Sequence, residues 1–105
     1  MDKIPDNIID IINRFLQKLE KSDIHIKEAI LFGSYAKGIN NEWSDIDLAL
    51  VSDSFCGNRF YDWDKLKEAK LSVSYDLSPL PYRPEDFTED NLFVKEILKY
   101  GIRII

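Results

Sequence analysis

Apolar residues near the start of the chain recur every three or four positions, which is the spacing of one face of an α-helix. This stripe consists of Ile8, Ile9, Ile12, Phe15, Leu16 and Leu19. Pro5 and Asp6 come just before it, and both are favourable at a helix N-terminus. The pattern therefore predicts an amphipathic helix over residues 6–20.

Two apolar runs that are short enough for buried strands follow this helix. Residues 27–32 form the first run, which ends at Gly33, and residues 34–41 are expected to form a short helical turn and a loop. Residues 45–52 form the second run, with the sequence IDLALV at its centre. Residues 53–60 contain serine, glycine and asparagine and are expected to be a loop.

The second half of the chain is predicted to add two helices and two strands. Residues 61–70 have helical spacing, and residues 71–77 alternate between apolar and polar in the manner of a strand. The following segment, SPLPYRP, holds three prolines in seven residues and is expected to be irregular. A last helix is expected to start at Thr88 and to end at Gly101, and residues 102–105 to form a short strand. This helix would bury one stripe, made of Phe93, Val94, Ile97 and Leu98.

The order of these elements predicts an α+β fold, an α/β sandwich in which helices pack on one face of a small mixed sheet. The chain has 105 residues, and 45% of them are hydrophobic, which fits a globular protein with one core. We therefore expect residues 1–105 to form a single domain.

Charge and cysteine content narrow the range of functions. The formal net charge is -5, and the longest basic candidate, from Lys65 to Lys70, is interrupted by Glu68, so we expect no direct nucleic-acid partner. The single cysteine, Cys56, and single histidine, His25, exclude an intramolecular disulfide and a zinc cluster. The first residues are charged, and no apolar run approaches the ~18 residues of a membrane span. We expect a cytoplasmic protein that does not bind membranes.

Asp45 and Asp47 are the first candidates for chemistry. They lie two residues apart in a predicted strand, so their side chains point to the same face. The opposite, core-facing side is apolar and consists of Ile46, Leu48 and Leu50. Two carboxylates this close raise each other's pKa unless a cation lies between them, and Mg²⁺ prefers such oxygen ligands. The simpler alternative is that both aspartates are exposed on the solvent face of an edge strand.

Gly33 and Ser34, at the end of the preceding strand, are a second candidate feature. Glycine lets the backbone approach a ligand closely, and a serine can cap a short helix whose N-terminal amides bind phosphate. Lys37, one turn later, would add a positive charge. Such a pair is usually only a turn, but Ser34 lies eleven residues before Asp45. That spacing leaves room for a short helix and a return, so adjacent strands would bring the two features together.

Asp76 is the third candidate. It shares the polar side of the predicted strand 71–77 with Ser72 and Ser74. An aspartate on the open face of a third strand would complete a metal site with three carboxylates. The alternative is again an exposed aspartate on an edge strand.

Taken together, the segments GSYAKG at 33–38 and SDIDLAL at 44–50 resemble the DNA polymerase beta-like nucleotidyltransferase superfamily. The family pattern is a hydrophobic residue, G-S-x-A-x-G, a short loop, S-D-h-D-h (h is hydrophobic) and a later aspartate on a separate strand. The matching residues are Gly33, Ser34, Ala36, Gly38, Ser44, Asp45, Asp47 and, as the later aspartate, Asp76. Over essentially its whole length the chain is similar to the minimal nucleotidyltransferases, which implies their fold and the absence of a separate acceptor-binding module.

The resemblance implies a role for each matching residue. Asp45, Asp47 and Asp76 would be catalytic and would bind two Mg²⁺ ions that bridge the triphosphate of ATP. Of these, Asp76 would lie nearest the acceptor and help to deprotonate its hydroxyl. The phosphates would also be held by Gly33 and Ser34.

Lys37 is a weaker candidate for contact with the phosphates, because related proteins often carry arginine at this position and lysine lacks the bidentate geometry. Tyr35 and Trp43 border the motif, and either of them could stack on the nucleobase. The segment SPLPYRP and the tail from residue 100 to residue 105 are candidate contact surfaces for a hetero-oligomer.

The resemblance also implies a partner. Many minimal nucleotidyltransferases pair with a HEPN-domain protein as toxin and antitoxin, and the antitoxin can transfer AMP from ATP to a tyrosine of the HEPN ribonuclease toxin. Two alternatives stay open. The chain could neutralise its partner by binding alone, or it could modify a small molecule, although enzymes of that kind usually carry an added helical domain.

Overall fold

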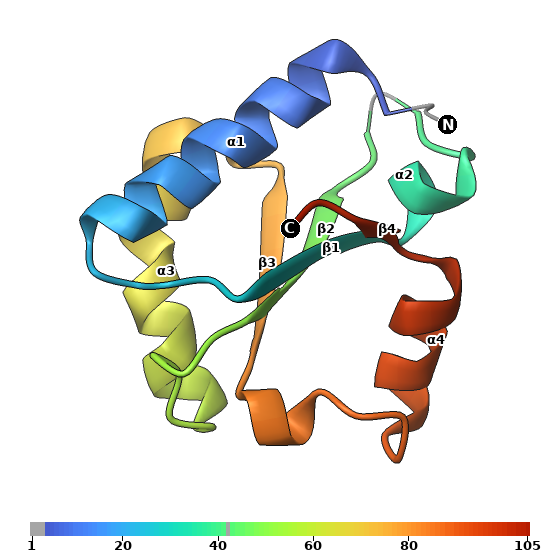
Figure 1. Ribbon diagram of the computed structural model, residues 1–105. Coiled ribbons are helices and arrows are strands. Elements are labelled where there is room, and N and C mark those ends of the chain that lie inside the picture. The colour runs from blue at the N-terminus through green and yellow to red at the C-terminus, as the bar shows by residue number, and fades with distance from the viewer. Residues whose placement is uncertain (1–3, 42) are drawn as a thin grey trace.

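The computed structural model describes residues 4–41 and 43–105 and shows a four-stranded sheet with helices around it (Figure 1). The elements are, in order, α1 (Asp6–Lys21), β1 (Glu28–Phe32), α2 (Ser34–Lys37), β2 (Ile46–Val51), α3 (Arg59–Val73), β3 (Leu77–Tyr82), the 3₁₀ helix η1 (Pro84–Asp86), α4 (Leu92–Tyr100) and β4 (Ile102–Arg103). The charged first residues, which were used above to argue against a membrane span, include residues 1–3, and these lie outside the described part of the chain. Among the residues described, no helix has the length and apolar character needed to cross a membrane.

The sheet is mixed, as predicted, with the strand order β3-β2-β1-β4. β1 pairs with β2 and with β4 in antiparallel fashion, whereas β2 and β3 run parallel. The register places Phe32 of β1 opposite Asp47 of β2, and Ser78 of β3 on the other side of Asp47. The α+β fold class predicted from the order of elements is confirmed.

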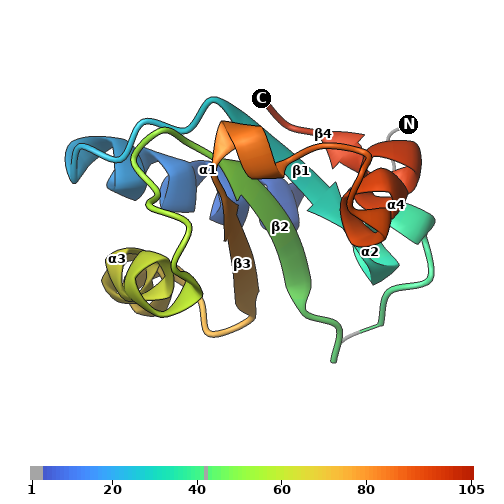
Figure 2. The ribbon, with the colours of Figure 1, turned by 90° about the horizontal axis from the view of Figure 1, so that it is seen from below.

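The helices cover both faces of the sheet, so the expectation that they pack on one face is wrong (Figure 2). One face of β2 presents three of its apolar residues to the core formed with α1 and α3. Ala49 and Val51 point to the other face, where they pack with Val94 and Ile97 of α4. Because successive side chains of a strand point to opposite sides, a strand that is apolar on both sides needs cover on both sides.

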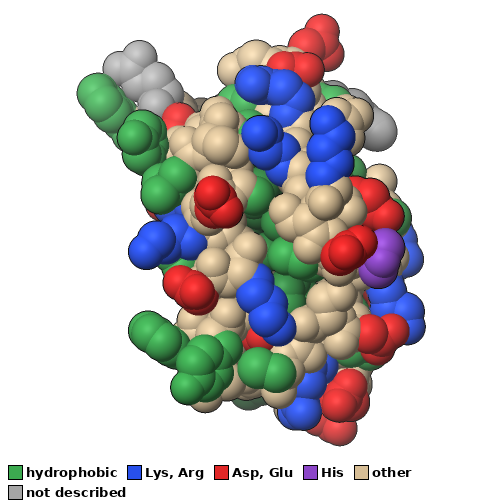
Figure 3. All heavy atoms as spheres, turned by 90° about the vertical axis from the view of Figure 1, so that its left-hand side faces the viewer, with side chains coloured by type: hydrophobic (Ala, Val, Ile, Leu, Met, Phe, Trp, Pro, Cys, Tyr) green, Lys and Arg blue, Asp and Glu red, His purple; other side chains and the backbone are tan. Residues whose placement is uncertain are grey.

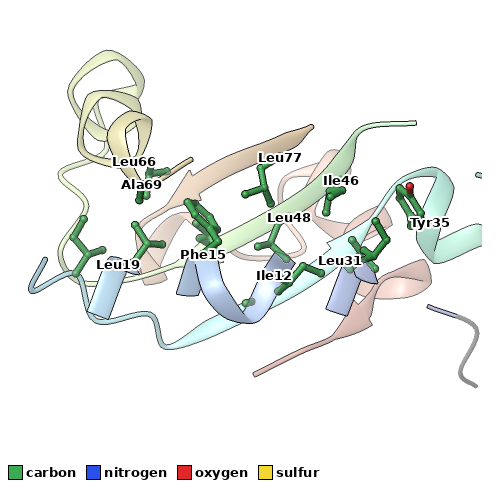
Figure 4. Close-up of a cluster of buried hydrophobic side chains, with 14 of the residues drawn as sticks. Ile12, Phe15, Leu19, Leu31, Tyr35, Ile46, Leu48, Leu66, Ala69 and Leu77 are labelled. Atoms are coloured by element: carbon green, nitrogen blue, oxygen red, sulfur yellow. The ribbon is translucent and has the colours of Figure 1, made fainter. Parts of the chain in front are cut away.

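The larger core lies between the sheet and the pair α1 and α3. Figure 4 shows side chains of α1, of the sheet and of α3 meeting in one layer. The predicted stripe of α1 supplies four buried residues, Ile8, Ile12, Phe15 and Leu19. Burial of a large apolar side chain contributes about 1.5–3 kcal/mol. The stripe therefore anchors α1 across the sheet, as its periodicity predicted.

Residues 71–77 do not form the predicted strand. α3 continues to Val73, and β3 covers Leu77–Tyr82 within the segment that was expected to be irregular. Leu66, Ala69 and Val73 lie at helical spacing and all pack against the larger core. This stripe extends the helix, and the alternation of apolar and polar residues after Lys70 is coincidental.

β3 tolerates its two prolines because it is an edge strand. The carbonyl oxygen of Asp76 accepts a hydrogen bond from the backbone N–H of Ile46 at 2.8 Å, and that of Tyr82 accepts one from the residue after β2. Backbone groups at even-numbered positions therefore face β2. Pro79 and Pro81 have their nitrogens on the open side, where no N–H donor is needed.

The last helix begins later than predicted, at Leu92 and not at Thr88. Its N-cap is Asn91, whose side chain accepts hydrogen bonds from the N–H groups of Phe93 at 2.9 Å and Val94 at 3.3 Å. Asparagine is among the best N-cap residues, and this cap sets the start of the helix.

The predicted apolar stripe of α4 is only half buried. Val94 and Ile97 are buried, whereas Phe93 and Leu98 are 51% and 39% exposed. The helix ends immediately before Gly101, as predicted.

Asp62 of α3 is a buried acid that sequence patterns did not identify. Its carboxylate accepts hydrogen bonds from the backbone N–H groups of Cys56 and Gly57, both at 2.9 Å. Burial by itself would raise the pKa of Asp62. The two backbone hydrogen bonds, together with the charge of Lys65, outweigh burial and hold this pKa below its usual value. Asp62 thus fastens the loop between β2 and α3 to the first turns of the helix.

We expect Asp62→Asn to lower the free energy of unfolding at pH 7 by about 1–3 kcal/mol, because an amide group would face one of the two N–H donors. The carboxylate has a lower pKa in the folded than in the unfolded state. Its contribution is therefore complete above about pH 5 and is lost as the pH falls through the folded-state pKa. Urea denaturation should show that the difference between wild type and variant narrows toward about pH 3. An equal difference at both pH values would contradict this role for the charge.

Candidate active site

The start of β2 brings two carboxylates onto one face of the sheet, as predicted. Asp45 precedes the strand and is exposed, and Asp47 is its second residue and is half-buried. Burial raises the pKa of Asp47, and the neighbouring Asp45 carboxylate raises it further. A cation bound between these oxygens would relieve both effects, and oxygen donors suit a hard divalent ion such as Mg²⁺. These two aspartates therefore fit a divalent metal.

Gly33 lies directly against the Asp47 carboxylate. The end of β1 pairs with Asp47 through Phe32, and Gly33 follows with a φ of 78°. A Cβ atom at Gly33 would collide with Oδ2 of Asp47, so only glycine allows this approach. Ser34 is the next residue and opens α2. Gly33, and not Ser34, occupies the N-cap position, so the expected capping by the serine side chain is wrong.

Lys37 ends the single turn of α2 and is exposed. Its Nζ lies 5.9 Å from the centre of the Tyr100 ring in α4, a distance compatible with a cation–π contact. The Lys37 side chain therefore extends toward α4, one helical turn after Ser34.

Asp76 comes next to Asp45, but from a different element than predicted. It lies in the turn before β3, and its carbonyl oxygen bonds to Ile46. Because Ile46 pairs with Leu77 in parallel register, continuing the register by one residue sets Asp76 opposite Asp45, on the same face. The three carboxylates are not gathered: within residues 4–41 and 43–105, no three acidic, histidine or cysteine side chains are close enough to hold a metal ion. The backbone thus brings Asp76 beside Asp45, but the three described side chains are not gathered into a metal site.

An exposed aromatic ring beside Asp47 was missed from the sequence. Phe93 of α4 contacts Phe32 edge to face, with ring centres 5.7 Å apart, and Phe32 is the partner of Asp47 across the sheet. Phe93 was predicted to lie in the buried stripe of the last helix. It is the second residue of α4 and is exposed. Of the two aromatic residues proposed to stack on a base, Tyr35 is buried in the core with α1, whereas Trp43 is 83% exposed.

The chain is similar to known nucleotidyltransferases in sequence. Residues 9–104 match the family described as nucleotidyltransferase domain. Two proteins of Methanocaldococcus jannaschii, both provisionally named protein adenylyltransferases, are 33% identical over 92 residues and 31% identical over 109 residues. The matches cover 83% and 92% of this chain, and 60% and 98% of the respective relatives. The chain thus spans less than two thirds of the first relative and nearly all of the second.

Solved structures show the same fold at lower identity. A provisionally named nucleotidyltransferase from Sulfolobus solfataricus aligns with a TM-score of 0.69 and 16% identity over 92% of this chain and 78% of that one. A structure described as a toxin–antitoxin with AMP-PNP aligns with a TM-score of 0.65 and 16% identity, over 92% and 72%. The sequence match, supported by this shared fold, shows that the chain belongs to the nucleotidyltransferase domain family.

Proposed function

We propose that the chain is a Mg²⁺-dependent antitoxin that transfers AMP from ATP to a tyrosine hydroxyl of a HEPN-type ribonuclease toxin. The observation that carries this proposal is the approach of the Gly33 backbone to the Asp47 carboxylate, with Asp45 on the same face. The names of the two archaeal relatives and the toxin–antitoxin neighbour with AMP-PNP support the reaction and the kind of partner.

The candidate residues divide into two groups in this proposal. Asp45, Asp47 and Asp76 would hold Mg²⁺, which stabilises negative charge on the phosphates of ATP. Gly33 and Ser34 would bind the β- and γ-phosphates through a backbone that can approach them closely. Lys37 would add a positive charge from the next turn.

The transfer itself needs one bond made and one broken. The tyrosine oxygen forms a bond to the α-phosphorus, the bond from that phosphorus to the bridging oxygen breaks, and pyrophosphate leaves. Asp76 would accept the hydroxyl proton, a role supported by the position of its backbone beside Asp45 in the exposed turn before β3. This role requires its side chain to turn toward the other two carboxylates.

Neutralisation by binding alone is the second candidate function. The observation that favours it is that Asp45, Asp47 and Asp76 are not gathered into a metal site among the described residues. The two candidates differ in whether the partner is covalently changed.

The Asp47→Asn variant distinguishes transfer of AMP from neutralisation by binding alone. We expect wild type, co-expressed with a HEPN-domain partner, to add one or more AMP groups to it, and Asp47→Asn to lower the rate of addition at least about 100-fold. Intact-mass spectrometry of the partner over time measures the added AMP and the rate of its addition by each variant. Asp10→Asn, at an exposed position on α1, is the matched control and should behave as wild type. Neutralisation of the toxin by Asp47→Asn without any mass change would support binding alone.

A pair of glycine variants tests the close approach at Asp47. Gly33 and Gly38 have φ values of 78° and 73°, so alanine strains the backbone at both by about 1–2 kcal/mol. Only at Gly33 would the new Cβ meet Asp47, because nothing lies within 4 Å of the corresponding position at Gly38. We expect Gly33→Ala to weaken binding of ATP with Mg²⁺ by at least about tenfold relative to Gly38→Ala. Calorimetric titration measures this, and equal affinities would contradict the role of Gly33.

A further inference from the structure

One side of α3 exposes aromatic and basic side chains that the core does not use. The helix packs Asp62, Leu66 and Ala69 inward. A second row on the same helix, here called the α3 stripe, consists of Arg59, Phe60, Trp63, Lys67, Lys70 and Leu71. Within it, Phe60 is 74% and Leu71 is 45% exposed. Along the left side of Figure 3, where α3 lies, hydrophobic side chains lie among basic and acidic ones. The exposed face of a monomeric helix is normally polar, so the α3 stripe has the composition of a contact surface.

The α3 stripe contains a shaped groove. It is an open hollow of about 630 Å³, lined by Arg59, Phe60, Trp63, Asp64 and Lys67. Nζ of Lys70 lies 5.6 Å from the centre of the Trp63 ring, which holds the indole against the helix. Aromatic and arginine side chains placed in this way are the commonest anchors of protein interfaces.

The charge of the α3 stripe differs from that of the whole chain. The chain has a net charge of -5, yet the stripe holds three positive side chains, Arg59, Lys67 and Lys70, against the single acidic side chain of Asp64 in its groove. Glu68, which interrupts the basic run in the sequence, lies on another side of the helix, because successive helical residues are about 100° apart. The partner that fits the α3 stripe therefore presents acidic groups around an apolar side chain.

The C-terminal end of α3 comes near the candidate active site, although α3 packs on the sheet face opposite Asp47. Figure 1 shows that α3 ends at the edge of the sheet where β2 and β3 begin. Tyr75, which is 81% exposed, links the end of α3 to Asp76. The helix spans roughly 22 Å at about 1.5 Å per residue. A protein lying along the α3 stripe would thus reach the Asp76 side of the site.

We propose that the α3 stripe is the docking surface for the acceptor protein, which inserts an apolar side chain between Phe60 and Trp63 and places acidic residues against Lys67 and Lys70. This inference rests on the proposed function, in which the acceptor hydroxyl approaches Asp76. A protein fits the stripe better than a nucleic acid, because Asp64 lines the groove and a polyanion would meet a chain of net charge -5.

Two variants of the α3 stripe, each with a matched control, test the docking surface. Lys67→Glu reverses a stripe charge, and Lys18→Glu makes the same change at an exposed position on α1. Phe60→Ala removes a stripe ring, and Leu92→Ala removes a similarly exposed apolar side chain on α4. We expect each stripe variant to raise both the Kd for the acceptor and its KM in the transfer reaction about tenfold, with unchanged kcat and unchanged affinity for ATP with Mg²⁺. The controls should match wild type, and equal melting temperatures would confirm folding.

The outcomes separate this inference from the proposed function. Acceptor binding that depends on the α3 stripe, without any transfer by wild type, would support the docking surface and overturn the transfer reaction. Transfer with the same KM in stripe variants and controls would overturn the docking surface and leave the reaction standing. Binding of a single-stranded oligonucleotide that Lys67→Glu abolishes, or a dimer of this chain that Phe60→Ala dissociates, would also overturn it by assigning the stripe to another occupant.

Discussion

The antiparallel pairing of β1 with β2 determines where the groups of the candidate active site lie. It places Phe32 opposite Asp47. The next residue must then be glycine, because a Cβ atom at position 33 would collide with the Asp47 carboxylate. A shift of this register by one residue would turn both aspartates toward the core with α1. The same pairing buries Leu31 and Leu48 on the core side, so the packing that stabilises the fold also fixes the carboxylates.

The sheet is covered unequally on its second face. Phe87, which follows η1, packs on Tyr82 at one end of this face, and α4 contacts Phe32 at the other end, where Asp47 is half-buried and Ser78 is exposed. A face that is apolar at one end and polar at the other explains both the smaller second core and the open site. Phe93 of α4 contacts Phe32, which pairs with Asp47, so this helix borders the candidate site.

Local patterns predicted α1, β1, β2 and the pairing of Gly33 with the aspartates, because each depends on spacing within a short segment. The errors concern features set by distant parts of the chain. β3 contains Pro79 and Pro81, and it forms a strand only because it lies at the edge of the sheet beside β2. The burial of Asp62 depends on a loop that folds back onto α3, and neither apolar periodicity nor composition records such a contact.

Pro79 and Pro81 also restrict how other proteins can approach. The outer side of β3 offers no N–H donor at either proline, so a further strand would find at most a broken hydrogen-bond ladder there. Addition of a strand is a common route both to peptide recognition and to aggregation, and this edge is poorly suited to either. A partner on this side of the molecule would have to be recognised through side chains and not through the backbone of the sheet.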